Sequence, residues 1–133
     1  MASPELITSP DAPRAFGPYS PAIAVDGWCF VAGQVGWDAD LTGLQERGPA
    51  EQTVQALRNI EALLRAAGAG LADIVRTTVY VSSLEIVGDV NGAYESVFSD
   101  AGVVVLPTRT TIGALLPVDV EIDAIARIPS STS

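Results

Sequence analysis

The order of helix-like and strand-like segments limits the fold of this chain more than any other feature of its sequence. Apolar residues recur at every third or fourth position in segments 49–67 and 89–101, which predicts two amphipathic helices. Pro49 suits the first turn of the first helix, and Gly68 and Gly102 suit the positions that end each helix. Shorter runs rich in β-branched residues are typical of strands. They lie at 22–25, 28–35, 73–82, 108–116 and 119–128, and residues 5–8 can form a further short edge strand.

This order predicts an α+β fold in which two helices pack on one face of a mixed β-sheet. The dipeptide Asp26-Gly27 between the first two long runs has the turn chemistry of a β-hairpin. Two helices cover only one sheet face, so the other face is expected to pack against another subunit. At 133 residues the chain is predicted to be a single domain, 1–133, with a core at about 10–128 and a flexible tail at 129–133.

Composition argues against several classes of partner. The net charge is −9, and the seven basic residues are scattered, which disfavours nucleic acids and anionic membrane surfaces. No apolar run approaches the ~20 residues of a membrane-spanning helix, and the N-terminus has no signal-peptide pattern. The single cysteine, Cys29, cannot form an internal disulfide and is expected to be a buried thiol. These observations favour a cytoplasmic protein.

The chain contains no histidine, so the usual general base at neutral pH is missing. Chemistry must therefore use a carboxylate, a hydroxyl, backbone groups or an arginine, and Arg109 and Glu121 are the first candidates. One cysteine without histidine argues against a transition-metal site. Asp38 and Asp40 near Thr42 faintly suggest a loop with oxygen ligands, but a solvated turn is the expected structure. The sequence has neither a GxGxxG motif nor a phosphate-binding loop.

The last predicted strand alternates between apolar and acidic residues. Asp119, Glu121 and Asp123 fall on one face, where three carboxylates repel one another unless something neutralises them. One interpretation is a solvated sheet face, and the other is a cleft in which Glu121 lies opposite a cation. Periodicity alone leaves both open.

The position of Arg109 relative to Glu121 depends on how the last two strands pair. If Pro117-Val118 is a tight turn, antiparallel pairing places Ala114 across from Glu121, and Arg109 then lies about 16 Å away. In that register the two side chains share a site only if a second subunit supplies one of them. The sequence thus predicts, conditionally on this hairpin, a site between subunits.

Tyr19 lies between Pro18 and Pro21 in a segment that is expected to form a stiff turn. Such a turn can hold a phenol at a fixed position in a site. The alternative, which these residues alone favour, is an aromatic side chain packed in a proline-rich loop.

Six short motifs, in this order along the chain, resemble the RidA/YjgF family. Together they cover nearly the whole sequence, from about Pro10 to Ile128. The motifs are 17–22 (GPYSPA), 31–34 (VAGQ), 55–60 (QALRNI), 90–94 (VNGAY), 107–111 (PTRTT) and 120–126 (VEIDAIA).

This resemblance implies a chorismate-mutase-like fold and a homotrimer with clefts between neighbouring subunits. It further implies hydrolysis of reactive 2-imino or enamine acids to 2-oxo acids and ammonia, without a metal or an organic cofactor. Arg109 would bind the substrate carboxylate, Glu121 would position or activate the attacking water, and Tyr19 would line the cleft. The same resemblance places four further positions against the substrate: Ala32, Gly33, Asn91 and Thr111.

Three departures from the family pattern concern this site. Ala32 stands where many members carry serine, so the serine hydroxyl is absent there. Thr111 stands where many members carry cysteine, so the cysteine thiol is absent at that position. The segment between Arg109 and Glu121 is also shorter than usual. These changes leave the arginine, the glutamate and the tyrosine in place and are consistent with a shifted substrate preference.

Two alternatives to the deaminase interpretation remain open at this point. One is a non-catalytic trimeric module that binds a small carboxylate or a protein, in which Arg109 would bind and Glu121 would be structural. The other is a pathway-specific enzyme that uses the same cleft on another imine-like or keto substrate. Ribonuclease activity, which has been attributed to parts of the family, is disfavoured by the charge of −9 and the absence of histidine.

Overall fold

The computed structural model describes residues 3–130 and contains the predicted elements in the predicted order. The short edge strand at the N-terminus is present, and the long elements begin and end within two or three residues of their expected positions. Part of the tail predicted to be flexible, residues 131–133, lies outside the described residues. The strands are β1 (Glu5–Ile7), β2 (Ala22–Val25), β3 (Trp28–Gln34), β4 (Ile74–Val81), β5 (Thr108–Gly113) and β6 (Val120–Arg127). The helices are α1 (Pro49–Ala66) and α2 (Val87–Asp100), with short 3-10 turns η1 (Leu44–Glu46), η2 (Leu71–Asp73) and η3 (Leu84–Ile86).

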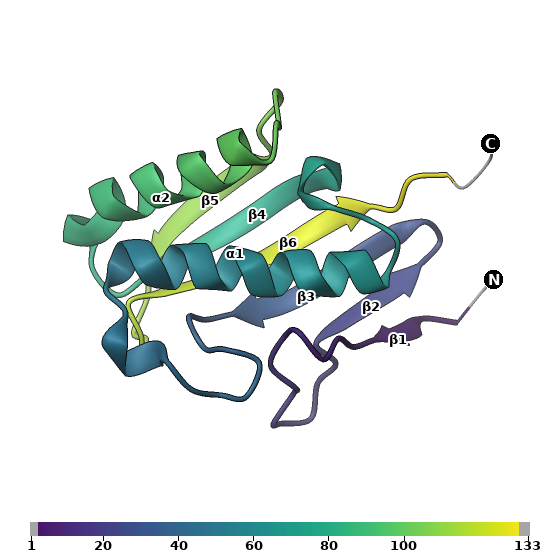
Figure 1. Cartoon of the computed structure of the whole chain (residues 1–133), viewed down its shortest axis with the longest axis horizontal. Helices are drawn as coiled ribbons and strands as arrows, with labels where there is room; N and C mark the ends of the chain where they lie inside the picture. Colours follow the sequence, from purple (N-terminus) through teal and green to yellow (C-terminus); the bar gives the residue numbers. More distant parts are fainter. Residues whose placement is uncertain (1–2, 131–133) are drawn as a thin grey trace.

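The strands form one mixed six-stranded sheet in the order β1-β2-β3-β6-β4-β5. All neighbouring strands are antiparallel except β4 and β5, which are parallel. Figure 1 shows α1 and α2 side by side on the same face of this sheet. The predicted α+β architecture is therefore confirmed.

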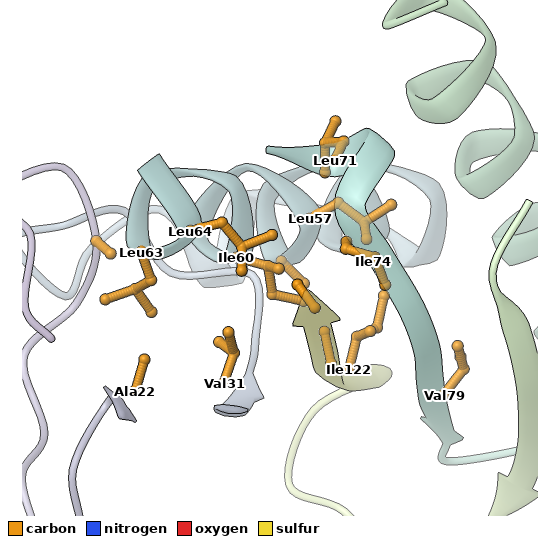
Figure 2. Packing of buried hydrophobic residues seen from close by; sticks show 14 of the residues in the cluster. Ala22, Val31, Leu57, Ile60, Leu63, Leu64, Leu71, Ile74, Val79 and Ile122 are labelled. Carbon is orange, nitrogen blue, oxygen red and sulfur yellow. The ribbon is translucent and has the colours of Figure 1, made fainter. Parts of the chain in front are cut away.

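The core lies between α1 and the centre of the sheet. Leu57, Ile60 and Leu64 on the predicted apolar stripe of α1 are fully buried, and they face Val31 and Ile122 on the strands below (Figure 2). The alternation predicted for the last strand is also present, because its even-numbered residues are buried under the helices while Glu121 and its same-face neighbours are not. This alternation directs Glu121 to the sheet face that carries no helix.

The hairpin considered for the last two strands is absent, and that expectation was wrong. β5 pairs in parallel with β4, whereas β6 lies antiparallel on the other side of β4. The reason is the helix α2, which connects β4 to β5 and brings the chain back to start a parallel neighbour. Residues 114–119 then cross the end of β4, where the Ala114 N–H donates to the Val81 carbonyl and the Ser82 N–H donates to the Asp119 carbonyl, both at 2.9 Å.

Asp119 also differs from its predicted place beside Glu121. It precedes β6, and its carboxylate accepts a hydrogen bond of 3.0 Å from the buried Gln52 side chain of α1. The acidic row on the open face of β6 is therefore reduced to Glu121 and Asp123. Asp123 in turn accepts a hydrogen bond of 3.2 Å from the Tyr80 hydroxyl.

The sheet face opposite the helices exposes several large apolar side chains. These are Leu6 on β1, Trp28 and Phe30 on β3, and Ile112 on β5. Such a surface is unusual for a face bathed in water and agrees with the expectation that a second subunit covers it. No helix formed by residues 3–130 is both long enough and apolar enough to cross a membrane.

Candidate active site

A cavity of about 740 Å³ opens where the N-terminal loop meets the ends of β3 and β6. It brings together four of the residues expected from the sequence, which come from three separate segments of the chain. They are Tyr19, Ala32, Gly33 and Glu121. The remaining lining residues are Pro13, Arg14, Ala15, Phe16, Pro21, Gln34, Val35, Trp37, Leu44, Pro117 and Val118.

Glu121 lies directly over Gly33 on the neighbouring strand. A Cβ atom built on Gly33 would overlap Glu121 Oε2 and would lie 2.8 Å from the Glu121 carboxyl carbon. The pairing of β3 with β6 shifts between Val31 and Gln34, so that β3 has one more residue than β6 in this stretch. This bulge, together with the missing side chain at Gly33, makes the room in which the carboxylate lies. A glycine inside a strand-like run is the sequence signal for such a bulge.

The environment of Glu121 raises the pKa of its carboxyl group above the ordinary value of 4.5. Partial burial is the main cause, and the negative charge of Asp123 on the same strand face is the second. A half-buried carboxylate with a raised pKa at the wall of a cavity is well suited to accept a proton from water.

The loop that carries Tyr19 forms a second wall of the cavity. The Tyr19 N–H donates to the Gly17 carbonyl at 2.8 Å, a tight turn that agrees with the stiffness expected from its prolines. The Tyr19 ring lies edge-on to Phe16, with centroids 6.3 Å apart, and Phe16 lies edge-on to Trp37 at 5.3 Å. The Ala32 N–H donates to the Pro21 carbonyl at 2.9 Å, which attaches this loop to β3.

Buried amides on α1 hold the opposite wall, and sequence reasoning missed them. Asn59 is fully buried and donates to the carbonyls of Val35 at 3.1 Å and Trp37 at 2.8 Å. Gln52 donates to the Arg47 carbonyl and the Asp119 carboxylate and accepts from the Asp119 N–H, each at 3.0 Å. The available signal was an amide residue facing inward within a helix, because such a group must find buried partners.

Arg109, Asn91 and Thr111 form a separate group on the helix side of the sheet. Arg109 Nε donates to Thr111 Oγ1 at 2.7 Å, and Nη2 donates to Asn91 Oδ1 at 2.6 Å. The guanidinium carbon also lies 4.7 Å from the centroid of the Tyr94 ring. The Tyr94 hydroxyl is hydrogen-bonded to the Thr77 hydroxyl at 2.7 Å. The three predicted residues thus lie together, with Asn91 and Thr111 orienting Arg109, but none of the three lines the cavity.

Arg109 and Glu121 cannot meet within one chain. Arg109 of β5 pairs with the buried Thr77 of β4. Glu121 of β6, on the other side of β4, pairs with Tyr80. Three residues along the sheet and two strands across it correspond to roughly 10 Å in each direction. The two side chains also point to opposite faces, since Arg109 contacts α2 and Glu121 faces away from it. The predicted separation therefore holds, although the hairpin from which it was argued is absent.

Arg14 is the cationic side chain that lines the cavity within the described part of the chain. It was not among the site residues expected from the sequence. Its position five residues before Tyr19, in the same proline-rich loop, was the only local signal.

The remaining candidate groups have structural partners. Asp38 forms an ion pair of 2.8 Å with Arg47, whose Nη1 also donates to the Gly36 carbonyl at 3.0 Å. Burial of Cys29 raises the pKa of its thiol to about 11, so the thiol stays protonated at neutral pH. In residues 3–130, no three or more His, Cys, Asp or Glu side chains are grouped so that they could hold a metal ion.

Comparison with known proteins assigns the chain to a family. The family model described as Endoribonuclease L-PSP matches residues 9–128. A RutC family protein of Aquifex aeolicus is 37% identical over 88% of this chain and 92% of its own. A 2-iminobutanoate/2-iminopropanoate deaminase of Mus musculus is 38% identical over 92% of this chain and 90% of its own. The crystal structure of the YjgF gene product of E. coli is 32% identical, with a TM-score of 0.88 and coverage of 94% of this chain and 99% of that one.

These matches agree with the six sequence motifs and with the observed fold. The chain belongs to the YjgF/RidA family, whose model carries the description Endoribonuclease L-PSP.

Proposed function

We propose that this protein hydrolyses reactive 2-imino or enamine acids to 2-oxo acids and ammonia. The observation that carries the proposal is Glu121, a half-buried carboxylate with a raised pKa that lies over Gly33 at the wall of a cavity. The family membership supports it, because relatives 38% identical to this chain are named 2-iminobutanoate/2-iminopropanoate deaminases.

In the proposed reaction Glu121 accepts a proton from water while the water oxygen attacks the imine carbon. A carbon–oxygen bond forms, and the electron pair of the carbon–nitrogen double bond moves to nitrogen. Glu121 then passes this proton to nitrogen, and the carbon–nitrogen bond breaks with its electron pair leaving on ammonia. The hydroxyl oxygen of the intermediate forms the carbonyl of the 2-oxo acid as its remaining proton passes to Glu121 and from there to solvent. A protonated imine is already electrophilic, so the protein mainly needs to position the substrate and to supply one carboxylate.

We further propose that a neighbouring subunit supplies Arg109 to this cavity, in a homotrimer. Arg109 is oriented by Asn91 and Thr111, and neither bond uses Nη1. Its planar guanidinium group is therefore suited to bind a carboxylate through two parallel hydrogen bonds, in bidentate geometry. The exposed apolar residues on the open sheet face offer a surface through which subunits can assemble.

Assembly is tested by light scattering on the purified protein at micromolar concentration. We expect a mass about three times the 13.8 kDa of one chain, because both the open apolar face and the divided site require neighbours. A species of one chain mass that does not change with concentration would contradict both the trimer and a site shared between subunits.

The activity is tested directly by ammonia release. We expect the protein to accelerate hydrolysis above the spontaneous rate for at least one member of a panel of aliphatic and aromatic 2-imino acids made in situ by an amino-acid oxidase. The deaminase proposal is falsified if no member of the panel is hydrolysed faster than in buffer containing the oxidase alone. Binding of 2-oxo acids without any turnover would instead favour a non-catalytic carboxylate-binding module, and turnover of only another imine or keto compound would favour a pathway-specific enzyme.

Ribonuclease activity is not the function that this site favours. The chain has a net charge of −9 and no histidine, whereas RNA binding requires a basic surface. The cavity that holds Glu121 is lined mainly by apolar side chains, with Arg14 as its cation.

A further inference from the structure

One wall of the cavity is not used by the proposed chemistry. Phe16, Val35, Trp37 and Leu44 line the cavity together with Glu121, yet none of them has a side-chain group that transfers a proton at neutral pH, and the Trp37 indole N–H is the one hydrogen-bond donor among their side chains. The charged or amide side chains of the lining are Arg14, Gln34 and Glu121. Most of the lining is therefore apolar, and it includes the packed rings of Phe16 and Trp37.

The apolar wall is held in place by buried hydrogen bonds. The carbonyls of Val35 and Trp37, on the two sides of Gly36, both accept from the fully buried Asn59 amide. The Asn59 oxygen accepts a hydrogen bond of 2.9 Å from Gln55, so the amide cannot turn over without losing a bond. The backbone at Trp37 is thus held before any ligand binds, which lowers the entropic cost of packing a ligand against this wall.

The aromatic rings are packed against each other but remain open to a ligand. Phe16 meets Trp37 at an interplanar angle of 63° and Tyr19 at 79°, so its faces are not stacked on either ring. Phe16 is 60% exposed and Tyr19 is 47% exposed. An apolar group that enters the cavity would remove this ring surface from water and could form further edge-to-face or offset contacts.

We propose that the cleft selects 2-imino acids with a large apolar, preferentially aromatic, side chain, whose ring packs against Phe16 and Trp37. This inference rests on the proposed deaminase function. With the imine carbon near Glu121, the substrate side chain extends toward the two rings. A cavity of about 740 Å³ lies within the range that encloses drug-sized ligands, whereas an imino acid of three or four carbons would leave the aromatic wall in contact with water.

The preference is tested by comparing kcat/KM for the 2-imino acids derived from phenylalanine and from alanine. Both are made in situ by an excess of amino-acid oxidase, and formation of the 2-oxo acid is followed above the spontaneous rate. We expect the phenylalanine-derived imine to be favoured by at least about tenfold, the lower end of discrimination by an apolar pocket. Equal values, or a preference for the alanine-derived imine, would overturn the inference while leaving the deaminase function intact.

Variants at Trp37 test whether the preference for the aromatic substrate comes from this side chain. Trp37→Ala should lower the ratio of the two kcat/KM values by about tenfold, mainly through the aromatic substrate, so the alanine-derived imine serves as a control within the same variant. Trp37→Phe keeps a ring at this position and should restore most of the ratio. An unchanged ratio in a folded Trp37→Ala protein would remove Trp37 from substrate selection.

A binding measurement separates failure of this inference from failure of the proposed function. Titration calorimetry should give a Kd for the 2-oxo acid of phenylalanine at least about tenfold below that for pyruvate, and Trp37→Ala should reduce the difference. This result without any imine turnover would overturn the deaminase proposal but support the aromatic pocket. Equal affinities would overturn the pocket, whatever the turnover.

Discussion

Replacing Arg109 by lysine is expected to lower kcat/KM on 2-imino acids by about 100-fold or more, with the fold retained. Lysine keeps the charge but has no planar fork, so it cannot hold a carboxylate in two-pronged fashion while also bonding to Thr111 and Asn91. A misplacement of about 1 Å at the reacting atoms is enough for a loss of this size. The measurement is steady-state kcat/KM, with circular dichroism and light scattering to verify folding and assembly.

Arg14 provides the matched control, because it is the arginine that lines the cavity of the same chain. Arg14→Lys should keep kcat/KM within a few-fold of the unmutated protein if a neighbouring Arg109 binds the substrate carboxylate. The opposite pattern, with normal activity in Arg109→Lys and a large loss in Arg14→Lys, would place the whole site within one chain. It would also remove the main reason for a cleft shared between subunits.

Glu121→Gln is expected to lower kcat by about 100-fold or more while leaving the affinity for a 2-oxo acid nearly unchanged. The amide has almost the same shape as the carboxylate but is a far poorer proton acceptor. Asp123→Asn is the control on the same strand face, and it should retain most of the activity because Asp123 bonds to Tyr80. Activity of Glu121→Gln close to that of the unmutated protein would exclude Glu121 as the base and favour the binding-module interpretation.

The pH dependence of stability gives an independent check on Glu121. Its pKa in the folded protein is raised above the ordinary 4.5, so the folded state favours the protonated form. The stabilising contribution of this group is complete below pH 4.5 and is lost as the pH rises through the folded pKa. Glu121→Gln should therefore gain stability relative to the unmutated protein as the pH rises through this range, and denaturant unfolding at pH 4 and pH 7 measures the difference. A variant that loses stability toward pH 7 would show that the carboxylate is stabilised rather than strained by its surroundings.

The sequence by itself determined the elements and the face on which each side chain lies. The spacing of Leu57, Ile60 and Leu64 predicted the buried side of α1, and the alternation along β6 placed Glu121 opposite the core. Both are local properties, because the period of apolar residues is fixed by the geometry of a single helix or strand. The short edge strand and the Asp26-Gly27 hairpin were readable for the same reason.

Only the tertiary structure decided which strands are neighbours and which side chains share the cavity. A strand's periodicity states which face is buried but not beside which strand it lies, so the pairing of β5 with β4 was missed. Asp119 left the acidic row because Gln52, far away in the sequence, bonds to it. Phe16, Trp37 and Glu121 line the same cavity, and the loop after β3 that carries Trp37 is held by the buried Asn59 amide of α1. Such long-range contacts depend on chain topology and on the partners available to buried polar groups, which no local pattern records.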